Sequence, residues 1–210
     1  MTEPFQADHV RGWLHRPETN PIAAMVLVHG AGSNCNAPLI VAIASELVRL
    51  GVLVFRGDLP FRQARAAGPP RPADSAKDRE GIRRAIEAIK LPGVPTLAGG
   101  HSYGGRQTTM LASEDSKIAA ALLLLSYPLH PPDKPEKLRT AHLPSLETPC
   151  FFVHGARDPF GSIEEMTAAL KLIPARTHLE ALANAAHDLG SAGKKADFVK
   201  SFLEFSYCAK

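Results

Sequence analysis

The chain has 210 residues, of which 45% are hydrophobic, so its length and composition suit one domain with a sizeable core better than two domains. Its 24 lysines and arginines nearly balance 21 aspartates and glutamates, and the net charge of +3 provides no concentrated basic face for nucleic acid. No segment approaches the ~20 apolar residues of a membrane span, and the N-terminus does not resemble a signal peptide. We expect one cytoplasmic domain over residues 1–210, a monomer or homodimer that binds neither nucleic acid nor a membrane.

The cysteines and histidines do not suggest a metal site. Cys35, Cys150 and Cys208 are odd in number and widely spaced, which indicates neither a disulfide framework nor a zinc site. No two of the nine histidines share the i, i+4 spacing that, together with an acid, marks a helix-borne zinc site. We therefore expect reduced thiols and no bound metal.

The first third of the chain alternates apolar runs with a helical pattern. Residues 22–29 form a continuous apolar run that ends at Gly30, which is typical of a strand buried on both faces. Apolar residues at helical spacing follow over 39–50, and Gly51 can close that helix in the left-handed conformation. Residues 52–55 are predicted to be the next strand.

A long loop and a glycine-rich turn are predicted in the middle of the chain. Residues 56–76 are rich in Pro, Gly and Arg, which predicts a long loop. A short strand over 96–98 leads into the glycine-rich turn, and a helix over 103–114 follows it. Between them a helix is predicted whose apolar face consists of Ile82, Ile86 and Ile89.

The apolar run 118–126 is too short to cross a membrane and predicts a central strand. Residues 127–149 contain six prolines, which predicts a loop, with a helical turn at 136–139. Another buried strand is expected at 150–155.

The end of the chain carries a helix start signal. Ser162 and Glu165 match a capping box, and a helix face continues to Ile173. Residues 177–182 are the last expected strand. The closing helix is marked by an apolar stripe of Phe198, Phe202 and Phe205.

Strands that alternate with helices predict an α/β fold with a mostly parallel sheet and helices on both faces. We expect about six or seven strands, including an antiparallel edge strand at 9–14. The loops after parallel strands share one edge of the sheet, so reactive residues in them gather there.

The segment "GGHSYGGR", residues 99–106, places one serine among glycines between a strand and a helix. Gly100, Ser102 and Gly104 fit G-x-S-x-G, the sharp turn that exposes a nucleophilic serine. The glycines are expected where a Cβ would clash between strand and helix.

A serine nucleophile needs a base and an acid that orients the base. His187, in "NAAHDLG" after the last strand, is the candidate base. Asp158, in "HGARDPFG", is the candidate acid, and Asp133 in the proline-rich loop is its weaker rival. The order Ser, Asp, His along the chain is the order expected of this fold.

The backbone N–H groups of Ala31 and Tyr103 occupy the positions expected of an oxyanion hole. Cys35 lies in the same loop as Ala31, and a second-nucleophile role is the weaker interpretation of it. Three further histidines adjoin strand ends and are expected to hydrogen-bond the backbone; they are His29, His101 and His154.

Arginines stand out near the predicted site. Arg106, in the helix after the serine, is either a buried ion-pair partner, for example of Asp58, or a solvated residue of the first turn. The loop 56–71 is expected to overhang Ser102, either as a source of positive field or as a solvated mobile segment. Its arginines are Arg56, Arg62, Arg65 and Arg71.

The segments "FRGDLPF", "GGHSYGGR", "YPLHPP" and "HGARDPFG" together resemble the α/β-hydrolase superfamily. More narrowly, the chain is similar to the small branch near the dienelactone hydrolases that has no cap domain, and to bacterial relatives of the hydrolase-like subunit of a histone-acetyltransferase complex. The resemblance implies a triad of Ser102, Asp158 and His187 and no cofactor. Dienelactone hydrolases have a cysteine where Ser102 stands, so their substrate does not carry over.

We therefore expect a serine hydrolase that cleaves small-molecule esters or thioesters of small acids through an acyl-enzyme on Ser102. A catalytically idle binding or scaffold protein of the same fold is the alternative, and perhydrolase chemistry would use the same residues. The proline-rich segment 127–149 has too few apolar residues for a long acyl tunnel, which predicts a preference for short acyl chains.

Overall fold

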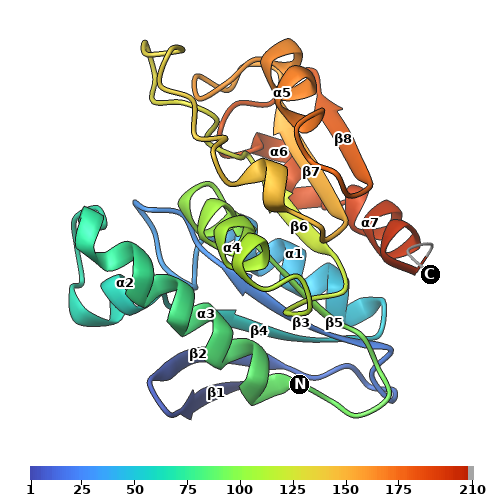
Figure 1. Cartoon of the computed structure of the whole chain (residues 1–210). Coiled ribbons are helices and arrows are strands. Elements are labelled where there is room, and N and C mark those ends of the chain that lie inside the picture. The colour runs from blue at the N-terminus through green and yellow to red at the C-terminus, as the bar shows by residue number, and fades with distance from the viewer. Residues whose placement is uncertain (208–210) are drawn as a thin grey trace.

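A twisted sheet runs through the molecule, which the computed structural model describes over residues 1–207 without the side chains of Ala192 and Lys194. Its strands are β1 (Thr2–Ala7), β2 (Val10–His15), β3 (Ala23–Val28), β4 (Val52–Gly57), β5 (Thr96–His101), β6 (Leu122–Leu125), β7 (Cys150–Gly155) and β8 (Thr177–Leu182). They lie in the order β1-β2-β4-β3-β5-β6-β7-β8 (Figure 1). The pairs β1–β2 and β2–β4 are antiparallel, and the remaining pairs are parallel.

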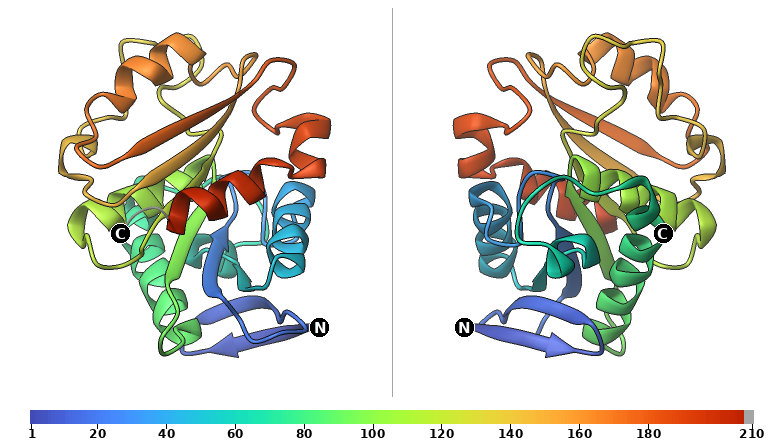
Figure 2. Two further views of the ribbon diagram at one scale, coloured as in Figure 1. Left: turned by 90° about the vertical axis from the view of Figure 1, so that its right-hand side faces the viewer. Right: turned by 90° about the vertical axis from the view of Figure 1, so that its left-hand side faces the viewer.

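Helices cover both faces of this sheet. They are α1 (Pro38–Arg49), α2 (Pro60–Ala64), α3 (Ser75–Ile89), α4 (Tyr103–Glu114), α5 (Ile163–Leu170), α6 (Gly190–Lys195) and α7 (Phe198–Tyr207). The apolar sides of α1 and α7 pack on one face of the sheet, and those of α3, α4 and α5 pack on the other. Figure 2 shows blue α1 and green α3 and α4 on opposite sides of the strands. Within the described residues, no helix has the length and hydropathy that crossing a membrane demands.

The central strands are rich in apolar residues because both of their faces are buried. All six residues of β3 are buried. Ala24, Val26 and Val28 contribute to the core under α3 and α4, whereas Met25 and Leu27 contribute to the core under α1. This alternation follows from the two-residue period of a strand, and the continuous apolar run in the sequence is its signature.

The predicted fold class is confirmed, and several elements lie where the sequence places them. The helix after the glycine-rich turn and the last strand have the predicted bounds. The capping box is also present, because Oγ of Ser162 accepts a hydrogen bond from the N–H of Glu165 at 3.2 Å. Of the cysteines, Cys35 and Cys150 are free and buried, and Cys208 lies outside the described residues.

The sheet has eight strands rather than six or seven, because β1 was not predicted. Its residues are exposed or half-buried throughout, so no apolar run marks it. Two residues with positive φ, Asp8 and His9, join β1 to β2. Such a hairpin turn is usually signalled by Asn-Gly or Asp-Gly, and this sequence has neither there.

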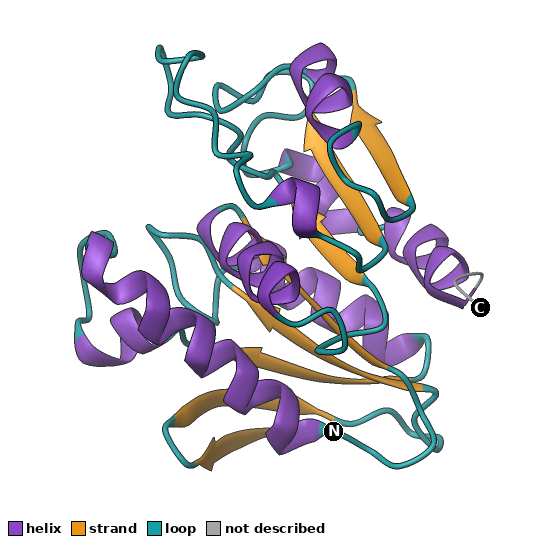
Figure 3. Cartoon of the chain, in the orientation of Figure 1, coloured by secondary structure: helices purple, strands orange, loops and turns teal. Residues whose placement is uncertain are grey.

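Two segments predicted as loops contain short helices. Residues 56–76 include α2 and a 3-10 turn at Pro72–Asp74. In residues 127–149 the helical turn lies at Leu143–Ser145 and not at 136–139. Figure 3 shows this second segment as an extended loop between β6 and β7 with one short helical turn. Proline occupies the first turn of each of these three helices, where its missing N–H is not needed.

Candidate active site

The serine of the glycine-rich turn lies between β5 and α4 in a strained conformation. Ser102 has a φ of 51°, which residues other than glycine rarely adopt. A Cβ on Gly100 would lie 2.6 Å from the carbonyl oxygen of Val28, and a Cβ on Gly104 would lie 2.5 Å from that of His29. Both distances are far below van der Waals contact, so glycine at both positions lets the turn close against the end of β3.

Ser102, His187 and Asp158 form one chain of hydrogen bonds. Oγ of Ser102 lies 2.8 Å from Nε2 of His187. Nδ1 of His187 lies 2.8 Å from Oδ2 and 3.0 Å from Oδ1 of Asp158. Because an ionised carboxylate can only accept, Nδ1 carries the proton and Nε2 is left to accept the serine proton. This tautomer suits His187 as a base toward Ser102.

The turn after β7 fixes both Asp158 and the ring of His187. Oδ1 of Asp158 accepts a hydrogen bond from the N–H of Phe160 at 2.9 Å. The ring of Phe160 packs on the imidazole of His187, with centroids 4.3 Å apart. The rival acid, Asp133, is exposed in a turn with a φ of 59°. The structure thus brings Asp158 to His187 and leaves Asp133 at the surface.

Three other histidines bind backbone carbonyls around the site, as predicted. His29, His101 and His154 each lie 2.8 Å from a backbone carbonyl oxygen. Burial is the largest cause that lowers the pKa of each one, which favours neutral imidazole rings. His101 donates to the carbonyl of His187 and so ties the end of β5 to the loop that carries the base.

The two predicted oxyanion donors, Tyr103 and Ala31, line the same cavity as Ser102. Tyr103 is the first residue of α4, so its N–H has no partner within the helix. Ala31 lies in the loop after β3.

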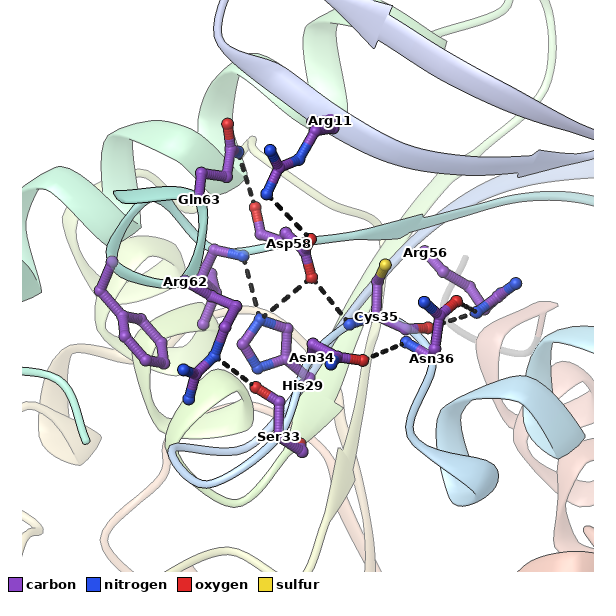
Figure 4. Close-up of polar contacts among 12 residues, drawn as sticks. Arg11, His29, Ser33, Asn34, Cys35, Asn36, Arg56, Asp58, Arg62 and Gln63 are labelled. Carbon is purple, nitrogen blue, oxygen red and sulfur yellow. Dashed lines mark hydrogen bonds and ion pairs between the residues drawn. The ribbon is translucent and has the colours of Figure 1, made fainter. Parts of the chain in front are cut away.

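Asp58, just after β4, and Arg62 of α2 hold the loop that contains Ala31 (Figure 4). Oδ1 of Asp58 accepts a hydrogen bond from the N–H of Cys35 at 2.9 Å. Arg62 donates from Nε to the carbonyl of Ser33 at 2.8 Å and from Nη2 to the carbonyl of Ala31 at 3.0 Å. Because a guanidinium donates in a fixed planar fork, Arg62 sets the path of this loop.

Neither alternative for the arginines of residues 56–71, a positive field beside Ser102 or a solvated mobile loop, fits all four of them. Arg56 is buried and donates a hydrogen bond to His15, and Arg62 donates to the backbone carbonyl of Ser33. Arg65 pairs with Asp74 at 2.6 Å. Arg71 alone of the four lines the cavity beside the serine.

Two alternatives weighed from the sequence are overturned. Burial, assisted by the carboxylate of Asp58, raises the pKa of the Cys35 thiol to about 12, so this cysteine stays protonated and is no nucleophile. Asp58 pairs with Arg11 at 3.4 Å and not with Arg106. Arg106 is not a freely solvated residue either, because its Nε is buried.

A cavity of about 570 Å³ lies beside Ser102. Its walls come from the segment before α3, the start of α4, the β6–β7 loop and the turn after β7. Its lining includes Ala31, Arg71, Tyr103, Arg106, Gln107 and Arg139.

Residues 21–203 match the family model of the alpha/beta hydrolase domain. The chain belongs to this family. Among solved structures, it is similar to Est1E from Butyrivibrio proteoclasticus with bound ferulic acid, at 20% identity and a TM-score of 0.77, covering 98% of this chain and 99% of that one.

Two further solved structures have the same fold. A dienelactone hydrolase from Anabaena variabilis has a TM-score of 0.75 at 18% identity, covering 99% of this chain and 98% of that chain. An α/β serine hydrolase without a lid, from Xanthomonas campestris, has a TM-score of 0.72 at 14% identity, covering 99% and 94%. The fold and the family are therefore established, and the chain has no cap inserted over the cavity within the described residues.

Sequence patterns did not point to three residues at the site. Arg62 lies in a segment whose composition predicts a loop. The spacing of residues in that segment does not indicate the hydrogen bonds of Arg62 to the loop that contains Ala31. Phe160 and Arg139 lie in loops whose paths depend on packing between distant segments. The position of Arg106, four residues after Ser102, and the arginines of the loop 56–71 were the available signals for the arginine side of the cavity.

Proposed function

We propose that this protein is a cofactor-independent serine hydrolase that cleaves esters or thioesters of small acids. The observation that carries the proposal is the unbroken chain of hydrogen bonds from Asp158 through His187 to Oγ of Ser102. A hydroxyl is a weak nucleophile, and this arrangement supplies the base that activates it.

In the first half-reaction, Nε2 of His187 takes the proton of Ser102 as Oγ attacks the acyl carbon. The N–H groups of Ala31 and Tyr103 donate to the oxyanion that forms. His187 then gives its proton to the leaving alcohol or thiol, and the acyl group stays on Oγ. Asp158 stabilises the imidazolium in both steps.

In the second half-reaction, His187 removes a proton from water, whose oxygen attacks the acyl-enzyme. The carboxylic acid leaves, and the proton returns to Ser102. If hydrogen peroxide replaced water, the product would be a peracid, so perhydrolase activity would use the same groups.

The proposal is tested with a fluorophosphonate probe, which reacts with activated serines. We expect Ser102 to be labelled in the native protein and not in urea, because Oγ is nucleophilic only when His187 is in place. Ser102→Ala is the control, and peptide mapping identifies the labelled residue. A folded protein that is not labelled, or a Ser102→Ala variant labelled equally, would contradict the proposal.

An idle scaffold with the same fold is the competing function. The resemblance to the hydrolase-like subunit of a histone-acetyltransferase complex suggests this function. We propose that relationship as well. The same labelling experiment decides between the two functions, because an idle site leaves Ser102 unreacted. We further propose that the enzyme works in the cytoplasm as a monomer or homodimer, where Cys35 and Cys150 would stay reduced.

A further inference from the structure

Two arginines from different segments meet in the cavity beside Ser102. Arg106 lies one turn into α4, and its N–H donates to the carbonyl of Ser102 at 3.0 Å. Arg139 lies in the β6–β7 loop, where its carbonyl accepts the hydroxyl of Tyr127 at 2.8 Å. Both side chains line the cavity. Burial and then the charge of Arg106 lower the pKa of Arg139.

No acidic side chain compensates these charges. Among the described residues, no ion pair within 4.0 Å includes Arg106 or Arg139, although other arginines such as Arg65, Arg79 and Arg83 form such pairs. Burial lowers the pKa of the adjacent His142 to about 4 and raises that of Tyr127 to about 12, so neither is charged at neutral pH. Arg71 adds a third, exposed guanidinium at the rim. Clustered like charges without a counter-ion are unfavourable, so an anion would relieve their repulsion.

A buried amide next to Arg106 also lacks a partner. Gln107 is 0% exposed and lines the cavity. Its Oε1 accepts hydrogen bonds from Ser75 at 3.0 Å and from Nη1 of Arg79 at 3.3 Å. Because a guanidinium only donates, the oxygen must face Arg79, and the amide nitrogen faces away from it. Nε2 of Gln107 and Nε of Arg106 are both buried without a hydrogen-bond partner in the described part of the chain, which is rare in protein interiors.

We propose that Arg106 and Arg139 form a subsite for a carboxylate of the substrate, so that the natural ester carries a free carboxylate close to the scissile bond. This inference rests on the proposed hydrolysis at Ser102. The planar fork of a guanidinium matches the two oxygens of a carboxylate. Four residues of helix rise by about 6 Å, so the spacing of Ser102 and Arg106 suits a short dicarboxylic acid esterified at one end.

The test compares two esters that differ in charge. Monoethyl glutarate carries a carboxylate, and ethyl glutaramate carries a neutral amide of the same shape. We expect kcat/KM to be roughly 10- to 100-fold higher for monoethyl glutarate at low ionic strength, and the ratio to shrink with added salt. A ratio near one overturns the subsite. A higher kcat/KM for the matching phosphonate ester, ethyl phosphonobutyrate, overturns the choice of a carboxylate.

Substitutions of single arginines test which side chains cause the preference for the charged ester. Arg106→Gln and Arg139→Gln should each lower the ratio of the two kcat/KM values about tenfold. Arg49→Gln removes the same charge from α1, where the side chain is 67% exposed and pairs with Glu46, and should keep the wild-type ratio. Partial unfolding lowers both rates alike and leaves the ratio unchanged. Wild-type ratios in both Arg106→Gln and Arg139→Gln overturn the proposal.

Binding of glutarate separates this inference from the proposed function, because it needs no turnover. Calorimetry should show glutarate binding that Arg106→Gln weakens about tenfold. If the protein hydrolyses neither ester but binds glutarate in this way, the subsite stands and the hydrolase proposal fails. If it hydrolyses both esters equally and does not bind glutarate, the hydrolase proposal stands and the subsite fails.

Discussion

Asp158 shows how one buried side chain can set the chemical state of another. Its side chain is 0% exposed, and its oxygens accept hydrogen bonds from the backbone of Phe160 and from Nδ1 of His187. A buried carboxylate needs such donors to offset its lost hydration. In return it holds the imidazole in the tautomer that leaves Nε2 free for Ser102.

Asp158→Asn should fold normally and lose most of its ester turnover. The amide is similar in shape, but its nitrogen can donate to Nδ1 of His187 and so favours the wrong tautomer. We expect kcat to fall on the order of a thousandfold or more. The measurement is ester hydrolysis at neutral pH, together with thermal unfolding to confirm the fold.

Asp133→Asn is the matched control, because the same change is made at the exposed rival position and asparagine tolerates its positive φ. Its turnover should stay near the wild-type value. The reverse pattern, with Asp133→Asn inactive and Asp158→Asn active, would show that the acid has been assigned to the wrong residue.

At the scale of elements, α2 and the loop 30–36 act as one unit. Arg62 of α2 donates to carbonyls on that loop and also to those of Arg65 and Gly68. It thereby joins the two loops that flank the cavity. An oxyanion donor acts only if it is held where the charge develops.

Arg62→Lys should lower kcat on the order of tenfold or more and change KM little. Lysine keeps the charge but cannot reproduce the planar fork, so the N–H of Ala31 loses its fixed position. Removing an interaction that is made only in the transition state lowers kcat and leaves KM nearly unchanged. The measurement is steady-state kinetics on a small neutral ester.

Arg65→Lys makes the same substitution three residues later, at an ion pair with Asp74 that lysine can keep. It should retain the wild-type kcat. If Arg62→Lys raises KM and leaves kcat unchanged, Arg62 does not position the oxyanion donor.

The elements that could be predicted have local causes. α4 follows a glycine turn and has no proline or glycine after Gly105, and β3 is apolar at every position, so each is visible in a short window of sequence. α2 has a different origin. The N–H of Phe61 donates to Asp78 at 3.0 Å, a residue of the next long helix, so contacts distant in sequence stabilise this short helix. No periodicity within five residues reveals such a contact.

The same distinction holds for the site. Ser102, Asp158 and His187 each follow a strand of a parallel sheet, and sheet topology brings the ends of these strands together. Their positions could therefore be inferred from order along the chain. Arg139 reaches the cavity because the β6–β7 loop folds back through its hydrogen bond to Leu129 at 2.8 Å. That path depends on packing, which spacing in the sequence does not encode.

At the scale of the whole molecule, buried histidines couple stability to pH. His15, His101 and His142 lie on separate elements, and burial is the largest cause that lowers the pKa of each from 6.5 to about 4. Between these values the unfolded chain binds protons that the native state does not. Stability therefore rises with pH through this window and is lost as the pH falls from about 6.5 toward 4.

His142→Gln should flatten this dependence. Each proton taken up on unfolding contributes up to about 1.4 kcal/mol per pH unit, and the variant removes one such group. The amide of glutamine can still bond the hydroxyl of Thr109, which lies 2.8 Å from the imidazole. The measurement is the free energy of unfolding in urea between pH 7.5 and pH 5.

His9→Asn, at the exposed turn between β1 and β2, is the control and should keep the wild-type slope. A His142→Gln variant with an unchanged slope would mean that His142 does not contribute to the loss of stability at low pH.

The open cavity also sets how much of an acyl chain the enzyme can bury. The wall beside Ser102 combines prolines and aromatic rings with three arginines and Gln107, so an alkyl chain along it meets charged groups as well as apolar surface. Each methylene contributes ~0.8 kcal/mol only if it leaves water for apolar surroundings. A growing alkyl chain along this wall would instead displace water from Arg106 and Arg139 without replacing its hydrogen bonds, which is unfavourable.

We therefore expect kcat/KM on neutral p-nitrophenyl esters to be highest between acetate and butyrate and to fall by octanoate, without interfacial activation. The first carbons fit beside Ser102, and further carbons either stay in water or desolvate guanidinium groups. Assays below the critical micelle concentration of each ester exclude artefacts of aggregation. Arg106→Leu should shift the optimum toward longer chains, because it replaces a charged wall by an apolar one. A steady rise in the wild type through decanoate would demonstrate a long apolar channel, and the chain-length preference would then have another origin than this wall.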